Sequence, residues 1–119
     1  MMFERLTRVL LTLLATLLLT SVDASNTPKK SWACEGMQVT ITCDSGETIN
    51  VLNAEYGYFD KVCDQEHPDI VCRITVTQRV AYICQGRLAC TVEVGSSNFQ
   101  NPCSQNLYKH LEIVYECKK

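Results

Sequence analysis

Eight cysteines in a chain of 119 residues constrain the fold more than any other feature of this sequence. In a small secreted chain, an even number of cysteines predicts a framework of disulfides. Each disulfide contributes about 2–4 kcal/mol to stability, mainly by restricting the unfolded chain. A chain this short has a marginal core, so the disulfides would decide whether it folds. The residues are Cys34, Cys43, Cys63, Cys72, Cys84, Cys90, Cys103 and Cys117.

A zinc site is the competing explanation for so many cysteines. Structural zinc sites use closely spaced ligand pairs, C-x-x-C above all, and the sequence contains no such pair. The two histidines, His67 and His110, are not spaced as a ligand pair either. We therefore expect disulfides, with no metal and no other cofactor.

The N-terminus has the pattern of a secretory signal peptide. Charged residues flank its start, an apolar and threonine-containing run covers residues 9–19, and Val22 and Ala24 are the small residues that signal peptidase favours. The apolar run has about 11 residues, short of the roughly 20 needed to span a bilayer, which argues against a membrane anchor. We expect a signal peptide at residues 1–24 and a secreted, extracellular protein without a membrane span.

The chain after residue 24 is long enough for one small domain. The signal peptide carries two acidic and two basic residues, so the net charge without it stays at −2. A nucleic-acid partner would favour a basic surface, and this charge argues against one. The polar segment 25–31 contains a proline and predicts a short flexible leader, which leaves residues 32–119 as the domain.

Hydrophobic alternation predicts strands in the first half of this domain. Residues 37–43 alternate between apolar and polar, and the turn-forming residues 44–46 follow them. Residues 48–52 then predict a returning strand, which would complete a hairpin. The polar segment 53–71 predicts a loop held by disulfides.

The second half predicts one helix and two further strands. An apolar stripe at i, i+4 and i+7 predicts a short helix over residues 75–84, with Gly86 free to take the positive φ of a helix exit. Residues 91–94 predict a short strand, and alternation over 111–117 predicts the last one. The fold class expected from these elements is α+β: a small, disulfide-rich, mostly antiparallel domain with one or two short helices and long loops.

Six short motifs occur in a fixed order along the domain: ACEG (33–36), ITC (41–43), NAEYGY (53–58), ICQGRLACTVEV (83–94), NPC (101–103) and YKHLEIVYEC (108–117). Together they resemble the galactose/rhamnose-binding lectin domain of the sea-urchin-egg-lectin type, which also occurs at the N-terminus of latrophilins. The resemblance spans residues 32–117, and all eight cysteines fall in the family's order.

The resemblance implies a set of disulfides that spacing alone leaves open, because eight cysteines allow 105 connectivities. One pair is also favoured by its position, since Cys84 and Cys90 are close in sequence across a turn that contains glycine. The implied pairs are Cys34 with Cys63, Cys43 with Cys117, Cys72 with Cys103, and Cys84 with Cys90.

The resemblance also implies a sugar-binding site that works without calcium. Adjacent sugar hydroxyls need a carboxylate acceptor and a cationic or amide donor, and the ring needs an apolar wall. Glu35 matches the family's carboxylate, Lys109 matches its lysine, and Tyr56 belongs to the Tyr-Gly motif. Asn101 and Asn106, in the loop before the last strand, complete the candidate sugar-binding residues.

The sequence departs from the family pattern near this site. Tyr58 stands where the family commonly has an arginine, and Asn101 replaces the aspartate of Asp-Pro-Cys. Asn106 replaces a glycine three residues before the lysine, in a loop that is one residue longer. These changes leave two interpretations: a lectin for terminal galactose- or rhamnose-like sugars on glycans or glycoproteins, or an extracellular protein-interaction domain with a lost or altered sugar site.

Catalysis finds no support in the sequence. We see no Ser-His-Asp, Cys-His or paired-carboxylate motif, and the cysteines are expected to be bridged rather than reactive. We therefore expect a binding protein and not an enzyme.

Overall fold

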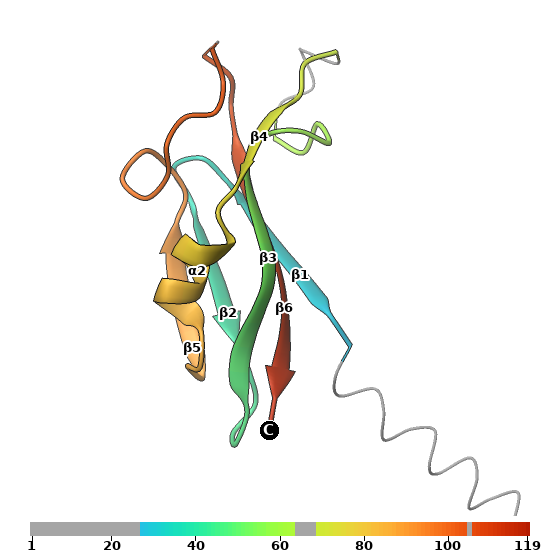
Figure 1. The fold of residues 1–119 in the computed structure, drawn as a ribbon, viewed down its shortest axis with the longest axis vertical. Coiled ribbons are helices and arrows are strands. Elements are labelled where there is room, and N and C mark those ends of the chain that lie inside the picture. The colour runs from blue at the N-terminus through green and yellow to red at the C-terminus, as the bar shows by residue number, and fades with distance from the viewer. Residues whose placement is uncertain (1–26, 64–68, 105) are drawn as a thin grey trace, which may run out of the picture.

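The computed structural model describes residues 27–63, 69–104 and 106–119. Within these ranges the chain forms six strands and one helix, which confirms the predicted α+β class (Figure 1). The predicted signal peptide lies outside the described residues. The elements are β1 (Lys29–Cys34), β2 (Gln38–Thr42), β3 (Thr48–Tyr58), β4 (Cys72–Thr75), α2 (Thr77–Cys84), β5 (Ala89–Glu93) and β6 (His110–Lys118).

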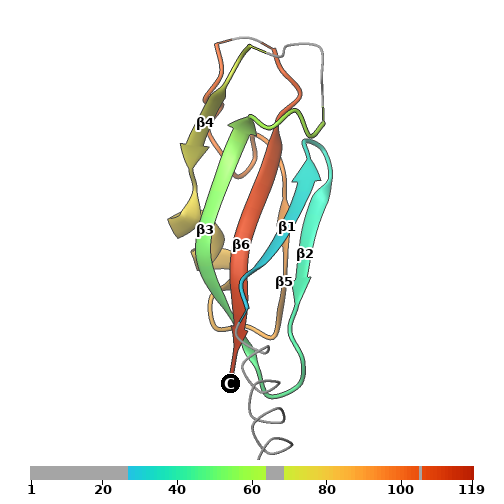
Figure 2. The ribbon, with the colours of Figure 1, turned by 90° about the vertical axis from the view of Figure 1, so that its right-hand side faces the viewer.

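The strands form two antiparallel sheets. The larger sheet has the order β1-β6-β3-β4, and the smaller sheet pairs β2 with β5. Both α2 and β5 lie on one side of the larger sheet, as the two perpendicular views in Figures 1 and 2 show. The core is therefore enclosed between the larger sheet and a second layer made of the helix and the smaller sheet.

Strand β6 shows how alternation fills this core. Leu111, Ile113 and Cys117 are buried, while Glu112 and Glu116 on the other face are partly exposed, as the sequence predicts. Residues from the other layer cover these side chains. Burying an apolar side chain of this size contributes about 1.5–3 kcal/mol to the stability of the fold. The second layer contributes Val39 and Ile41 from β2, Val80 and Cys84 from α2, and Val92 from β5.

The predicted helix is confirmed as α2. It begins two residues after the predicted start and ends at Cys84, with Val80 and Cys84 fully buried. Gly86 follows with φ 77°, a left-handed conformation that favours glycine and lets the chain turn back toward β5.

The predicted hairpin of residues 37–43 and 48–52 is wrong. Both strands exist, but β2 pairs with β5, and β3 pairs with β6 and β4. Alternation shows that a strand has one buried face, and it does not specify the partner strand. The amide of Gly86 donates to the carbonyl of Ile49, so the start of β3 bonds to the chain that leaves α2.

The predicted loop at residues 53–71 is also wrong in its first part, because β3 continues to Tyr58. The register of β3 against β6 shifts between Val51 and Asn53, which is a β-bulge at Leu52. The bulge moves the buried set from odd to even positions, where Ala54 and Tyr56 are buried. A single alternating pattern cannot span this change of phase, which is why the sequence did not predict one long strand.

The leader predicted at residues 25–31 is wrong from Lys29 onward. Residues 29–31 belong to β1, which pairs with β6 along its length. Lys29 and Lys30 are exposed, and Ser31 is partly exposed. An edge strand of this kind is held by backbone hydrogen bonds and needs little apolar alternation. The residues 27–28 form neither helix nor strand.

All four implied disulfides are confirmed, and no cysteine is free. The bridge from Cys43 to Cys117 ties the end of β2 to the end of β6, so it joins the two layers. The bridge from Cys84 to Cys90 closes the turn between α2 and β5. The remaining bridges are Cys34 to Cys63, and Cys72 to Cys103.

The two bridges of the core differ greatly in loop length, and this predicts different contributions to stability. Cys43 and Cys117 are 74 residues apart, whereas Cys84 and Cys90 are 6 apart. Restriction of the unfolded chain predicts a loss of about 4 kcal/mol when the long bridge is replaced by two alanines and about 2 kcal/mol for the short one. Urea unfolding of the two double-alanine variants measures both; equal losses, or a larger loss from the short bridge, would contradict this expectation.

Candidate functional site

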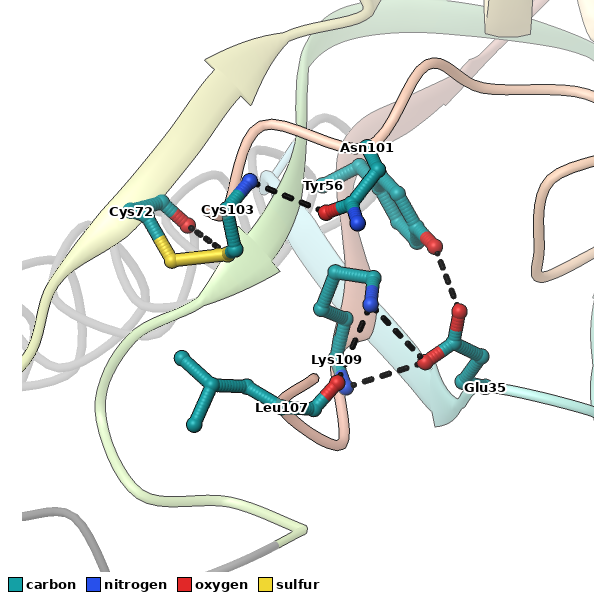
Figure 3. Close-up of a disulfide and its surroundings, with 7 residues drawn as sticks. All are labelled: Glu35, Tyr56, Cys72, Asn101, Cys103, Leu107 and Lys109. Carbon is teal, nitrogen blue, oxygen red and sulfur yellow. Dashed lines mark hydrogen bonds and ion pairs between the residues drawn. A yellow bond between two sulfur atoms is a disulfide. The ribbon is translucent and has the colours of Figure 1, made fainter. Parts of the chain in front are cut away.

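Three of the predicted site residues converge at one end of the larger sheet. Glu35 directly follows β1, Tyr56 lies on β3, and Lys109 directly precedes β6. The strand register causes this meeting, because Cys34 of β1 and Gly57 of β3 both pair with His110 of β6. Figure 3 shows the three side chains turned toward one another.

The carboxylate of Glu35 is the centre of this group. Its Oε2 accepts a hydrogen bond of 2.9 Å from the Tyr56 hydroxyl, and its Oε1 lies 3.3 Å from the Lys109 ammonium (Figure 3). The backbone amide of Lys109 also donates to Oε1, at 3.3 Å, and the amide of Glu35 donates to the Lys109 carbonyl at 2.9 Å. The turn after β1 is therefore fastened to the start of β6 by both backbone and side chain.

Lys109 carries a buried charge. The residue is 4% exposed, and its ammonium donates to the Leu107 carbonyl at 3.0 Å in addition to its ion pair with Glu35. A buried ammonium is costly unless it is paired and hydrogen-bonded, and these two acceptors meet that need. The side chain of Glu35 is 31% exposed, so Glu35 is the member of the pair that reaches solvent.

Tyr56 helps to orient the carboxylate of Glu35. Its ring is buried and packs against Phe99, with the ring centroids 5.1 Å apart. Burial raises the pKa of Tyr56 well above its ordinary value, and the hydrogen bond to Glu35 and the charge of Glu35 raise it further. The hydroxyl thus stays protonated at physiological pH and remains a donor to Glu35.

The second residue of the Tyr-Gly motif must be glycine for a steric reason. Gly57 has φ 154° and pairs with Arg73 of β4. A Cβ atom at this position would overlap the backbone carbonyl oxygen of Cys72. Only glycine lets β4 approach β3 at this point, next to Tyr56.

The two asparagines of the predicted site have different positions. Asn101 is exposed, and its Oδ1 accepts a 2.9 Å hydrogen bond from the amide of Cys103, so it shapes the turn beside the Cys72 to Cys103 bridge (Figure 3). Asn106 is exposed in the loop before β6, and among the described residues no hydrogen bond joins it to the Glu35 group. The sugar-contacting roles of both residues stay predictions.

His110, the first residue of β6, follows Lys109 directly and is buried. It is 1% exposed, and its ring packs on Phe59 at a centroid distance of 4.2 Å. Within the described part of the chain its Nε2 has no hydrogen-bond partner, and the nearest carboxylate oxygen, from Glu112, is 3.9 Å away. Desolvation lowers the pKa of His110, and the charges of Glu112 and Asp60 oppose this shift.

Two groups that build the site were missed by sequence reasoning. Phe99 supports Tyr56, and the only signal for it is an aromatic residue within an otherwise polar segment, residues 95–101. The Leu107 carbonyl accepts from the Lys109 ammonium, and a backbone acceptor leaves no signal in sequence.

Neither a metal site nor a membrane-spanning helix is found in the described ranges. No group of three or more histidine, cysteine, aspartate or glutamate side chains in residues 27–63, 69–104 and 106–119 is arranged to hold a metal ion. In the same ranges, no helix has both the length and the apolar character to cross a membrane.

The family of the chain is shown by comparison with known domains. Residues 41–117 match the D-galactoside/L-rhamnose binding SUEL lectin domain, and this range includes Tyr56, Asn101, Asn106 and Lys109. The chain belongs to this family, which confirms the resemblance carried by its motifs and its cysteine order.

Individual relatives agree with the family match. The L-rhamnose-binding lectin ELEL-1 of Echinometra lucunter is 35% identical over 96 residues, which cover 76% of this chain and 92% of that lectin. Adhesion G protein-coupled receptor L1 of Mus musculus is 33% identical over 94 residues, which cover 75% of this chain. Latrophilin Cirl of Drosophila pseudoobscura pseudoobscura is 34% identical over 98 residues, or 76% of this chain. The match spans only 6% of the length of each of these two larger proteins.

The unequal burial of Glu35 and Lys109 predicts unequal effects of removing each charge. Glu35→Gln leaves the buried ammonium without its carboxylate, and we expect a loss of about 1–3 kcal/mol. Lys109→Met fills the same space without charge and leaves a carboxylate that still has solvent and Tyr56, so we expect a loss of about 1 kcal/mol or less. Chemical denaturation of both variants tests the order; a larger loss for Lys109→Met would contradict it.

The burial of His110 predicts a loss of stability in mild acid. Its folded-state pKa is below its ordinary value of 6.5, so the unfolded chain binds the proton first as the pH falls. The stability that neutral His110 provides is complete above about pH 6.5 and decreases below it. We expect His110→Gln to lose less free energy of unfolding than the parent between pH 7.5 and pH 5, as measured by urea denaturation. Parallel curves for the two proteins would show that His110 does not titrate this way.

Proposed function

We propose that this protein is an extracellular lectin that binds a terminal galactose- or rhamnose-like sugar through Glu35, Lys109 and Tyr56. The observation that carries the proposal is the Glu35 group, in which a partly exposed carboxylate, a buried ammonium and a phenol hydroxyl lie within hydrogen-bonding range. Each of the three residues belongs to a motif that carries the family resemblance. The family description names galactosides and rhamnosides, and the similar sea-urchin protein is named as a rhamnose-binding lectin.

The chemistry of the group suits two adjacent hydroxyls of a sugar ring. A carboxylate has about four acceptor sites, and three are used by the Tyr56 hydroxyl and by the amide and ammonium of Lys109. An ammonium has three donors, and within the described residues two of them point to Glu35 and to the Leu107 carbonyl. One acceptor and one donor remain for a ligand. The remaining acceptor site of Glu35 would accept a hydrogen bond from one sugar hydroxyl. The remaining donor of Lys109 would donate to the neighbouring hydroxyl.

The same proposal excludes a bound cation as the means of holding the sugar. Calcium sites in proteins use six to eight oxygen ligands, often from several carboxylates. Here the carboxylate of the group, Glu35, is already paired with the Lys109 ammonium. We expect binding to be unchanged by a calcium chelator.

An extracellular location is supported by the disulfides. Four bridges join all eight cysteines, and such frameworks form and persist in oxidising compartments. The predicted signal peptide at residues 1–24 agrees with this location. Membership of a lectin-domain family favours binding over catalysis.

A titration of the purified protein with methyl galactoside and methyl rhamnoside, followed by calorimetry, tests the sugar site. Removing a charged hydrogen-bonding partner costs about 1.5–3 kcal/mol, so we expect Glu35→Gln and Lys109→Met to weaken binding about 10-fold to 100-fold. Circular dichroism at the assay temperature verifies that each variant is folded.

The matched control is Glu116→Gln. Glu116 also accepts an amide hydrogen bond, from Asn50 at 2.9 Å, and also pairs with a lysine, Lys118 at 3.1 Å, but it lies at the opposite end of β6. Its substitution should leave affinity unchanged. If neither glycoside binds the parent protein, the lectin proposal fails and the alternative of a protein-interaction domain with an altered site is favoured.

A further inference from the structure

We propose that a hollow beside Glu35 is a second sugar subsite, which binds the residue linked to the terminal sugar and prefers a neutral or amine-bearing residue to an acidic one. This inference rests on the proposed function and adds a preference for the second residue of the glycan. The hollow has a volume of about 440 Å³ and is bordered by the turn after β1 and by the loop after β5. That volume is in the range of small-molecule sites in proteins.

Among the described residues, Glu35 is the residue that the hollow shares with the proposed sugar site. Glu35 is part of its lining, whereas Tyr56 and Lys109 are not among the described lining residues. Glu35 therefore borders the hollow, while its carboxylate bonds to Lys109 and Tyr56. A ring held by Glu35 and Lys109 would leave the hollow open for the next ring of a chain of sugars.

The lining has the mixture of groups that a sugar ring needs. Met37 is 59% exposed and offers an apolar wall for the C–H face of a ring. Ser96 and Ser97 are exposed and present hydroxyls that both donate and accept hydrogen bonds. Gln38 adds an amide, whose Nε2 donates to the Glu93 carboxylate at 3.4 Å.

The charge of the lining sets the expected preference. The two charged residues among the described lining, Glu35 and Glu93, are both acidic. Lys109 neutralises Glu35, while the described contact of the Glu93 side chain is the neutral amide of Gln38. A carboxylate or sulfate on the second residue would be repelled by Glu93, and an amine would be attracted to it.

A larger hollow, of about 670 Å³, lies between the connection from β4 to α2 and residues 98–100. Its described lining includes Phe99 but neither Glu35 nor Lys109. It therefore has no direct contact with the charged groups of the proposed site, and the smaller hollow is the better candidate for a second ring.

Calorimetric titration with a matched series of disaccharides tests the subsite. In each disaccharide galactose is the terminal sugar, linked β1→4 to glucose, glucosamine or glucuronic acid, and methyl galactoside is the reference; rhamnose replaces galactose if its methyl glycoside binds better. We expect the glucose-containing disaccharide to bind about fivefold more tightly than the methyl glycoside, because Met37 covers part of the second ring. The amine should bind about two- to fivefold more tightly than the acid at low salt, and this difference should shrink at high salt.

Two exposed residues allow variants that leave the first site intact. Met37→Ala should remove the gain of the disaccharide over the methyl glycoside, and Leu88→Ala, a half-exposed apolar residue at the far end of the smaller sheet, should not. Glu93→Gln should remove the difference between the amine and the acid, and Asp44→Asn, at an exposed turn before β3, should not.

The outcomes separate this inference from the lectin proposal. Disaccharides that bind no better than the methyl glycoside, or variants at Met37 and Glu93 that behave like their controls, would overturn the subsite while leaving the first site in place. A parent protein that binds none of these sugars would overturn both. If Met37→Ala leaves the affinity for the methyl glycoside unchanged but removes the gain of the disaccharide over it, the subsite is supported.

Discussion

The carboxylate of Glu35 joins three segments that are distant in sequence. It bonds to the hydroxyl of Tyr56 on β3 and to both nitrogens of Lys109 at the start of β6, while its own backbone continues from β1. The carboxylate neutralises the Lys109 ammonium, which is buried within the protein. The same carboxylate stays partly exposed, so the group that stabilises this end of the sheet is also the one available to a ligand. Structure and proposed function therefore depend on one interaction.

The strands and disulfides make that interaction possible. Pairing of β1 and β3 with opposite sides of β6 brings Cys34 and Gly57 to the same residue, His110. The bridge from Cys34 to Cys63 holds the chain next to Glu35, and the bridge from Cys72 to Cys103 holds the turn of Asn101. Because a domain of this size buries a limited core, covalent links near the site replace packing that a larger protein would use.

The predictable part of the fold came from features that are local or motif-based. Alternation in β6 and the stripe of α2 depend on neighbours in sequence, and the disulfide pairing was implied by the family resemblance. The hairpin of β2 with β3 was wrong because alternation carries no information on which strand is the partner. The length of β3 was missed because the bulge at Leu52 changes which residues are buried, and β1 was missed because an exposed edge strand needs no apolar pattern.

The arrangement of the candidate site was predicted in part for similar reasons. Glu35, Tyr56 and Lys109 belong to motifs, so the resemblance placed them together, and the geometry brings them within bonding distance. The burial of Lys109, the support of Tyr56 by Phe99 and the Leu107 acceptor depend on three-dimensional packing, which a motif does not encode. The roles of Asn101 and Asn106 toward a sugar depend on the ligand itself.

A crystal structure of the protein with methyl galactoside or methyl rhamnoside measures the central claim most directly. The account predicts two adjacent ring hydroxyls within about 3.2 Å of the Glu35 carboxylate and the Lys109 ammonium, with the Tyr56 hydroxyl still bonded to Glu35. A sugar bound elsewhere on the domain, with no contact to Glu35 or Lys109, would contradict it.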